Sequence, residues 1–190
     1  TRMKSSTPKV LQCLGGISLI ERVLSSCKSI NPNRCILIVG HHAQKVKSAL
    51  THYNQIEFAL QQPQKGTGHA VQQLIPVLDN FEGQLIVLNG DVPLLQPSTI
   101  KNLLDNHISN KSEATILSAR LSDPKGYGRI FANQGGKVDA IIEEKDCNDQ
   151  QRQNTLTNSG IYCFEWKKLK KVLSSLASNN SQNEIYLTDA

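Results

Sequence analysis

The sequence predicts an α/β fold in which a mostly parallel, mixed β-sheet is flanked by helices. Short, continuous apolar runs such as 35–39 and 85–88 are typical of strands that are buried on both faces. Amphipathic segments of helical period separate these runs. Because strand, loop and helix alternate in this way, a parallel sheet covered by helices is the expected architecture.

The first 120 residues follow this alternation without interruption. Leu19, Ile20 and Val23 fall on one helical face, Gly40 ends the first apolar run, and Pro76 stops a helix. The expected elements are a helix over 19–27, a strand over 35–39, a helix over 43–50, a strand over 56–60, a helix over 69–75, a strand over 85–88, a helix over 98–108 and a strand over 115–119.

The pattern changes after residue 120. Strands are expected over 128–132, 138–142 and 160–164 with little helix between them, which indicates an antiparallel or mixed section. A further helix begins near Trp166 and carries a cluster of lysines. We interpret this cluster as a solvated helix face rather than an RNA-binding patch. Its members are Lys167, Lys168, Lys170 and Lys171.

Composition restricts the class of protein. The 190 residues suffice for one domain with a buried core, and 38% hydrophobic with 19% charged residues is an ordinary globular balance. No run is long and apolar enough to span a bilayer and no signal peptide opens the sequence, so we expect a cytoplasmic protein without a membrane partner. The net charge of +5 fits a polyanionic substrate or a nucleic acid, but 5% aromatic residues argue against RNA.

The cysteines and the chain ends give two further expectations. The five cysteines include no Cys-x-x-Cys pair, which favours reduced thiols over zinc or disulfides. The sequence starts at Thr1 as if within a loop and stops at Ala190 where an apolar segment begins. We therefore expect residues 1–190 to be a fragment of a longer chain.

The turn after the 85–88 strand holds the first candidate functional residue. In open α/β sheets, ligands bind beyond the carboxyl ends of the strands, and Asp91 lies there after Asn89 and Gly90. A lone carboxylate suits one ligand position of Mg²⁺, whose other ligands are phosphates and water. Equally, Asp91 could cap the following helix. Spacing alone leaves both interpretations open.

Four other segments carry polar residues of interest, each with a structural alternative. In the loop 61–68, Gly66, Thr67 and Gly68 could present backbone N–H groups to an anion or a base edge, or could simply form a turn. The 123–129 segment reads first as a hairpin loop. The 143–146 segment reads as a solvated strand end, and the cations near the start as a basic tail or as phosphate ligands.

Taken together, these segments resemble a known enzyme family. The similarity covers the whole chain and is carried by residues 1–3, 7–11, 65–70, 89–94, 123–130, 143–146 and 158–160. They are similar to the uridylyltransferase domain of the bifunctional bacterial UDP-N-acetylglucosamine pyrophosphorylase and glucosamine-1-phosphate N-acetyltransferase family. The resemblance implies a nucleotide-diphospho-sugar transferase fold with Rossmann-like topology. It also implies transfer of UMP from UTP to N-acetylglucosamine 1-phosphate in cell-envelope precursor synthesis.

The resemblance implies a role for each matching residue. Arg2 and Lys9 would be catalytic, stabilising charge on the triphosphate and the sugar phosphate. Asp91 would bind the Mg²⁺ cofactor. The implied substrate-binding residues are Lys9, Gln61, Gly66, Thr67, Asn89, Gly90, Asp91, Gly128, Glu143 and Asn158. Asn89 departs from the pattern, because some members carry Tyr at this position.

The same resemblance implies which parts of the domain the sequence lacks. An apolar strand and a signature loop would precede Thr1, and a second metal ligand, an Asn, would follow Ala190. A C-terminal acetyltransferase domain, which carries the trimer contacts in the family, would also follow, so the full-length protein would be a homotrimer. The fragment itself could be inactive. Two alternatives stay open: another sugar-1-phosphate nucleotidyltransferase, and a non-catalytic module that binds nucleotide sugars.

Overall fold

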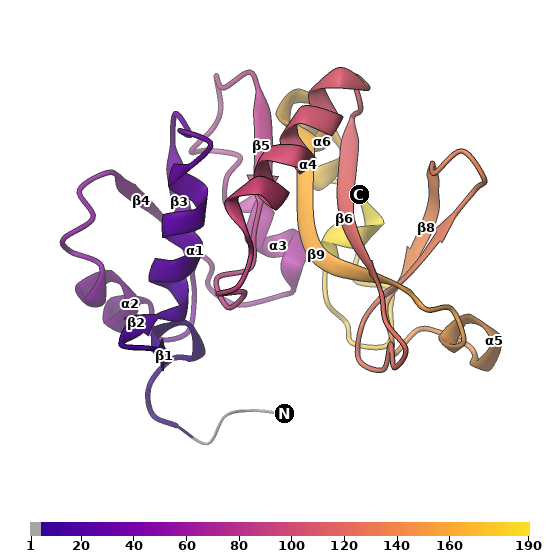
Figure 1. The fold of residues 1–190 in the computed structure, drawn as a ribbon, viewed down its shortest axis with the longest axis horizontal. Helices are drawn as coiled ribbons and strands as arrows, with labels where there is room; N and C mark the ends of the chain where they lie inside the picture. The colour runs from indigo at the N-terminus through magenta and orange to yellow at the C-terminus, as the bar shows by residue number, and fades with distance from the viewer. Residues whose placement is uncertain (1–4) are drawn as a thin grey trace.

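A parallel pair of strands and a five-stranded sheet form the framework of the part of the chain that the computed structural model describes, residues 5–190 (Figure 1). The parallel pair consists of β3 (Cys35–Val39) and β4 (Ile56–Leu60). The five-stranded sheet contains β5 (Gln84–Val87), β6 (Ala114–Arg120), β7 (Arg129–Ala132), β8 (Val138–Ile142) and β9 (Leu156–Glu165). A short hairpin of β1 (Cys13–Leu14) and β2 (Ile17–Ser18) precedes them.

The five predicted helices are present with shifted ends, and three short helical segments, η1, α5 and η2, are additional. In chain order, the helical elements are η1 (Lys9–Leu11), α1 (Leu19–Lys28), α2 (Ala43–Ala49), α3 (Thr67–Gln72), α4 (Pro97–Ser109), α5 (Asp149–Arg152), α6 (Trp166–Leu173) and η2 (Leu187–Asp189). A capping box of Ser18 and Glu21 starts α1. Helix α3 starts at Thr67, two residues before the predicted start, and therefore includes part of the glycine-bearing loop.

The α/β class and the mixed sheet are confirmed. The pairing differs in one respect from the expected mostly parallel sheet: among the described strands, only β3 and β4 pair in parallel. The reason is β9, a ten-residue strand that pairs antiparallel with β5, β6 and β7. Strands β6 and β7 are joined by the 123–129 segment but do not pair with each other, so the hairpin interpretation of that segment is wrong.

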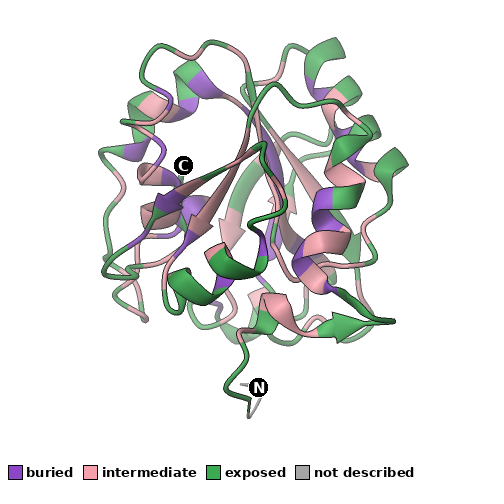
Figure 2. Cartoon of the chain, turned by 90° about the vertical axis from the view of Figure 1, so that its left-hand side faces the viewer, coloured by how far each residue is buried: buried purple, intermediate pink, exposed green. Residues whose placement is uncertain are grey.

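The main hydrophobic core lies between the five-stranded sheet, α3 and α6. Trp166 and Leu173 are fully buried there, and Trp166 Nε1 donates a hydrogen bond to the Leu78 carbonyl at 2.9 Å. Figure 2 shows the buried residues along the strands and on the inner sides of the helices. Three lysines of α6, Lys167, Lys168 and Lys170, form ion pairs with Glu82, Glu113 and Asp79, respectively, which supports the solvated-face interpretation.

A cavity separates the two groups of strands. Its volume is about 800 Å³, and residues of both β3 and β5 line it together with Ile20, Val23 and Leu24 of α1. Strand β3 pairs only with β4, and β5 lies at the end of its sheet. Both strands were expected to be buried on both faces, yet all their described residues except Val39 are half-buried or exposed. The cavity explains this difference, because it leaves one edge of each strand uncovered.

The cysteines, the helices and one pair of histidines complete the description of the fold. All five cysteines are free, with Cys147 and Cys163 buried and Cys13 exposed. None of the described helices reaches the length and apolarity that a bilayer span requires. The adjacent pair His41 and His42 is exposed, and no group of three metal-ligating side chains occurs among the described residues.

Candidate active site

The turn after β5 places Asp91 beside Lys9. The Lys9 ammonium group donates a hydrogen bond to Asp91 Oδ2, and the two side chains are 59% and 30% exposed. Gly90 makes this approach possible, because a Cβ atom there would lie 3.1 Å from Ile20 Cδ1 and 3.3 Å from Val10 Cγ1. The glycine at position 90 therefore allows η1 to pack closely against the carboxyl end of β5.

The structure resolves the two interpretations of Asp91. Helix α4 begins at Pro97, with Gln96 at its N-cap, so Asp91 lies well before the helix. The capping interpretation is wrong. What remains is a partly exposed carboxylate next to a cation, at the carboxyl end of a strand, where ligands of such sheets bind.

Asn89 connects this turn to β9. Its Nδ2 donates a hydrogen bond to the Ser159 carbonyl at 3.2 Å. Gly160, at φ +74°, lies so close that a Cβ atom there would be 2.6 Å from Asn89 Nδ2. Gly160 N in turn donates to Asn158 Oδ1 at 2.8 Å. The Asn89 side chain is thus held against the strand that carries Asn158.

Gly128, Glu143 and Asn158 lie close together. A Cβ atom on Gly128 would lie 3.3 Å from Glu143 Oε2 and 3.4 Å from Asn158 Cβ, and Asn158 N donates to the Gly128 carbonyl at 2.9 Å. Tyr162 exchanges hydrogen bonds with the Asn158 amide at 2.7 and 3.1 Å. Burial raises the pKa of Tyr162 to about 12, so its hydroxyl stays protonated and fixes Asn158.

Glu143 is not the solvated strand end that its sequence context suggested. It is half-buried, and burial is the main cause that raises its pKa above the ordinary value. The nearby carboxylates of Asp146 and Asp189 raise the pKa further, whereas a hydrogen bond from Thr188 opposes the rise. Its neighbour Glu144 has a structural role, because it pairs at 2.8 Å with the buried Arg129.

The loop before α3 is fixed by its own side chains and by the end of the chain. Buried Gln61 donates from Nε2 to the Gly66 carbonyl at 2.9 Å. Gly66 has φ +106°, and a Cβ atom on it would lie 2.5 Å from the Ile185 carbonyl oxygen. Leu187 N donates to Thr67 Oγ1 at 3.0 Å. These contacts fix the backbone of a loop whose residues 62–65 are exposed.

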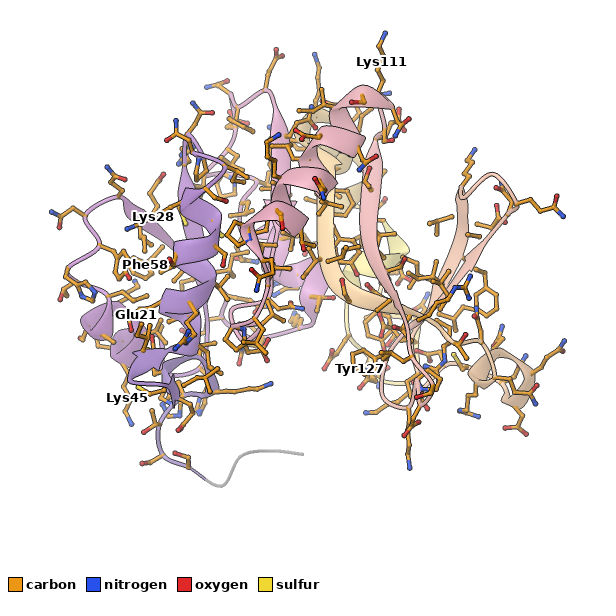
Figure 3. The ribbon with its side chains drawn as sticks, viewed as in Figure 1. Glu21, Lys28, Lys45, Phe58, Lys111 and Tyr127 are labelled. Carbon is orange, nitrogen blue, oxygen red and sulfur yellow. The ribbon has the colours of Figure 1, made fainter. Side chains whose placement is uncertain are left out.

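These contacts form one connected set. They run from Lys9–Asp91 through Gly90, Asn89, Gly160, Asn158, Gly128, Glu143, Thr188, Leu187, Thr67 and Gly66 to Gln61, by hydrogen bonds, close approaches and chain neighbours. In Figure 3, Tyr127 of the loop that leads to Gly128 lies at the end of β6 opposite to Lys111. Every predicted site residue within 5–190 belongs to the set, whereas Arg2 lies outside the described residues.

The sequence patterns missed Tyr162, which fixes Asn158, and Thr188, which binds Glu143. Thr188 donates from Oγ1 to Glu143 Oε1 at 3.1 Å across 45 residues of sequence. No local pattern marks such a contact, since it depends on where the last segment of the chain is placed. For Tyr162, its position four residues after Asn158 on the same strand was the one available signal.

Comparisons with known proteins agree with this fold. The family model described as Nucleotidyl transferase matches residues 3–189. The "Bifunctional protein GlmU" of Prochlorococcus marinus (strain MIT 9313) is 60% identical over 189 residues, which cover 100% of this chain and 42% of that protein. The chain spans about 42% of the length of the curated relatives that it matches first. The predicted resemblance to the bifunctional family is thereby confirmed.

Two solved structures share the fold at low sequence identity. A UDP-glucose pyrophosphorylase complexed with UDP-glucose superimposes with a TM-score of 0.78 at 17% identity, covering 96% of this chain and 76% of that chain. A putative glucose-1-phosphate thymidylyltransferase from Bacillus anthracis gives a TM-score of 0.77 at 20% identity, covering 96% and 72%. With the family match over almost its whole length, the chain belongs to the nucleotidyl transferase family.

Proposed function

We propose that this chain carries the site that transfers UMP from UTP to N-acetylglucosamine 1-phosphate, giving UDP-N-acetylglucosamine and pyrophosphate for cell-envelope synthesis in the cytoplasm. The connected set of side chains supports this proposal. A cation and a carboxylate (Lys9, Asp91) lie at one end, a polar cluster (Gly128, Glu143, Asn158) in the middle, and the loop with Gln61 at the other end. In this proposal the first group binds the triphosphate, the second binds the sugar and the third binds the base.

The reaction that we propose requires positioning more than proton transfer. A phosphate oxygen of the sugar phosphate attacks the α-phosphorus of UTP, the new O–P bond forms, and the bond to the bridging oxygen of pyrophosphate breaks. The attacking oxygen is already anionic, so no general base is needed. Lys9, with a mostly exposed side chain, and Arg2 would offset the repulsion between the two anionic reactants.

Asp91 fits a magnesium ion. It offers a single, partly exposed carboxylate of hard oxygens, and Mg²⁺ takes its other ligands from phosphates and water. When bound, the ion would supply positive charge beside the polyphosphate. In the same proposal Gln61 and Gly66 read the uracil edge with Thr67 beside them. The turn of Asn89 and Gly90 contributes to substrate binding next to Asp91.

The cavity between β3 and β5 supports a second part of the proposal, that the domain is larger than residues 1–190. A strand upstream of Thr1 would pair with the free edges of both strands and fill about 800 Å³ with apolar side chains. Pro8, Lys9 and Val10 lie at the wall of this cavity, so the preceding chain can reach it. We further propose that the second metal ligand and a trimer-forming acetyltransferase domain follow Ala190.

The decisive test is pyrophosphate release from UTP and N-acetylglucosamine 1-phosphate, measured with Mg²⁺ on the full-length parent protein. We expect turnover with this pair and little with dTTP, CTP or other sugar phosphates. Turnover with a different pair only would show another sugar-1-phosphate nucleotidyltransferase. Tight binding of UDP-N-acetylglucosamine without turnover under any Mg²⁺ concentration would show a regulatory module and end the catalytic proposal.

A further inference from the structure

The last described segment of the chain connects the two halves of the proposed site. On one side, Leu187 N at the start of η2 donates to Thr67 Oγ1 at 3.0 Å, and Gly68 N donates to the Ile185 carbonyl at 2.8 Å. On the other side, the next residue, Thr188, donates from Oγ1 to Glu143 Oε1 at 3.1 Å. Because both contacts come from consecutive residues, the loop before α3 determines where the Thr188 hydroxyl lies.

The two oxygens of Glu143 have different surroundings. Oε1 accepts the Thr188 hydrogen bond. Oε2 faces Gly128, and a Cβ atom added there would lie only 3.3 Å away, so a side chain at position 128 would crowd this oxygen. With Oε1 fixed, the carboxylate plane cannot rotate freely, and Oε2 stays directed toward Gly128, next to Asn158.

The surroundings of Glu143 offer few other groups that keep it ionised. The titratable groups that face it from the packed segments are Asp146, Asp189, Tyr162 and Tyr186. Two of these are acids and two are neutral phenols at pH 7, and burial raises the pKa of Glu143 as well. The hydrogen bond from the Thr188 hydroxyl, in contrast, lowers the pKa of Glu143.

We propose that Thr188 is a positioning residue whose hydroxyl holds the Glu143 carboxylate so that Oε2 accepts a hydrogen bond from an N–H or O–H group of the sugar. This inference rests on the proposed function. It extends that function by assigning sugar selectivity to the contact between Thr188 of η2 and Glu143. Because η2 also contacts the loop that would hold the base, the binding of the sugar would depend on the position of that loop.

Steady-state kinetics of the full-length protein test this role. For Thr188→Val, which keeps the side-chain shape, we expect the KM for N-acetylglucosamine 1-phosphate to rise about tenfold, since hydrogen bonds to charged groups are the stronger ones. The KM for UTP should change little, and Thr188→Ser should restore the wild-type values. The matched control is Thr51→Val, because Thr51 is exposed and its hydroxyl donates only to the Ser48 carbonyl.

The pH dependence separates positioning from simple loss of structure. Without the Thr188 donor, the Glu143 carboxylate becomes protonated at a higher pH. The acid limb of the pH profile of kcat/KM for the sugar phosphate should therefore shift to higher pH. In a protein that already carries Glu143→Gln, adding Thr188→Val should cause no further shift of this acid limb. A ¹³C titration of the Glu143 carboxyl should show a higher pKa in Thr188→Val, and this readout does not depend on turnover.

The outcomes distinguish the inference from the function on which it rests. An inactive wild-type protein would refute the proposed reaction, and the carboxyl titration would still decide the role of Thr188. Unchanged sugar KM and unchanged Glu143 titration in Thr188→Val would overturn the inference. Equal increases of KM for both substrates, with lower thermal stability, would also overturn it by showing a structural role.

Discussion

The ammonium group of Lys9 and the carboxylate of Asp91, 82 residues apart in sequence, form an ion pair at the carboxyl end of β5. Both side chains are partly exposed, and exposed ion pairs contribute little to folding. The pair therefore brings two opposite charges to the place where a polyphosphate and its counter-ion would bind, and its main consequence is for chemistry.

Replacing Asp91 by Asn should separate these two roles. We expect Asp91→Asn to lower kcat of the full-length protein by more than about a hundredfold, as loss of transition-state charge stabilisation does. The free energy of unfolding should change by less than about 1 kcal/mol, the range of exposed ion pairs. Pyrophosphate release and urea unfolding measure the two effects. Asp105→Asn is the matched control, because Asp105 pairs with Lys101 on the exposed side of α4; a large stability loss in Asp91→Asn would contradict this division.

Gly66 should not tolerate a side chain. Its φ of +106° is unfavourable for other residues, and an added Cβ atom would lie 2.5 Å from the Ile185 carbonyl oxygen. Gly66→Ala should cost about 1–3 kcal/mol of stability and raise the KM for UTP, because η2 and the loop must move apart. Thermal unfolding and kinetics measure both. Gly136→Ala isolates the backbone effect, since Gly136 has φ +78° and no atom within 4 Å of the added Cβ. Equal losses in both variants would refute the contact argument.

Part of this site could be predicted from the sequence, because glycines and polar residues after apolar runs mark the carboxyl ends of strands. That reasoning singled out Gly66 and Asp91, each with a structural alternative, whereas the role of Gly128 came only from the family resemblance. The reasoning from sequence patterns could not find Thr188, whose contact with Glu143 depends on long-range packing. It also gave the strands a mostly parallel arrangement, since no local pattern shows that β9 returns antiparallel between β5 and β6.

His107 should make the fold sensitive to acid. It is 1% exposed, with Nδ1 2.8 Å from Thr115 Oγ1 and Nε2 2.7 Å from Gln84 Oε1. Burial lowers its pKa below the ordinary value, so the folded state prefers the neutral ring and the unfolded chain binds more protons. This stability is present above pH about 6.5 and is lost as the pH falls through the lowered pKa. Urea midpoints between pH 8 and 5 should fall less steeply in His107→Gln than in exposed His41→Gln; identical slopes would contradict the prediction.

The cavity between β3 and β5 leads to a prediction about hydrogen exchange. In the 190-residue chain, the backbone amides of β3 and β5 that do not bond to β4 or β9 face the cavity and should exchange rapidly. If a strand upstream of Thr1 fills the cavity in the full-length protein, the same amides should become protected there, and an apolar dye that binds the 190-residue chain should bind the longer protein weakly.

Amides of the β6–β9 ladder serve as the internal control, because their partners are present in both chains and their protection should not change. Protection of β3 alone or of β5 alone would show that the upstream strand pairs with only one of the two edges. If the amides of β3 and β5 exchange at the same rates in the 190-residue chain and in the full-length protein, the cavity stays open in both. That result would refute the proposal that an upstream strand pairs with these two edges.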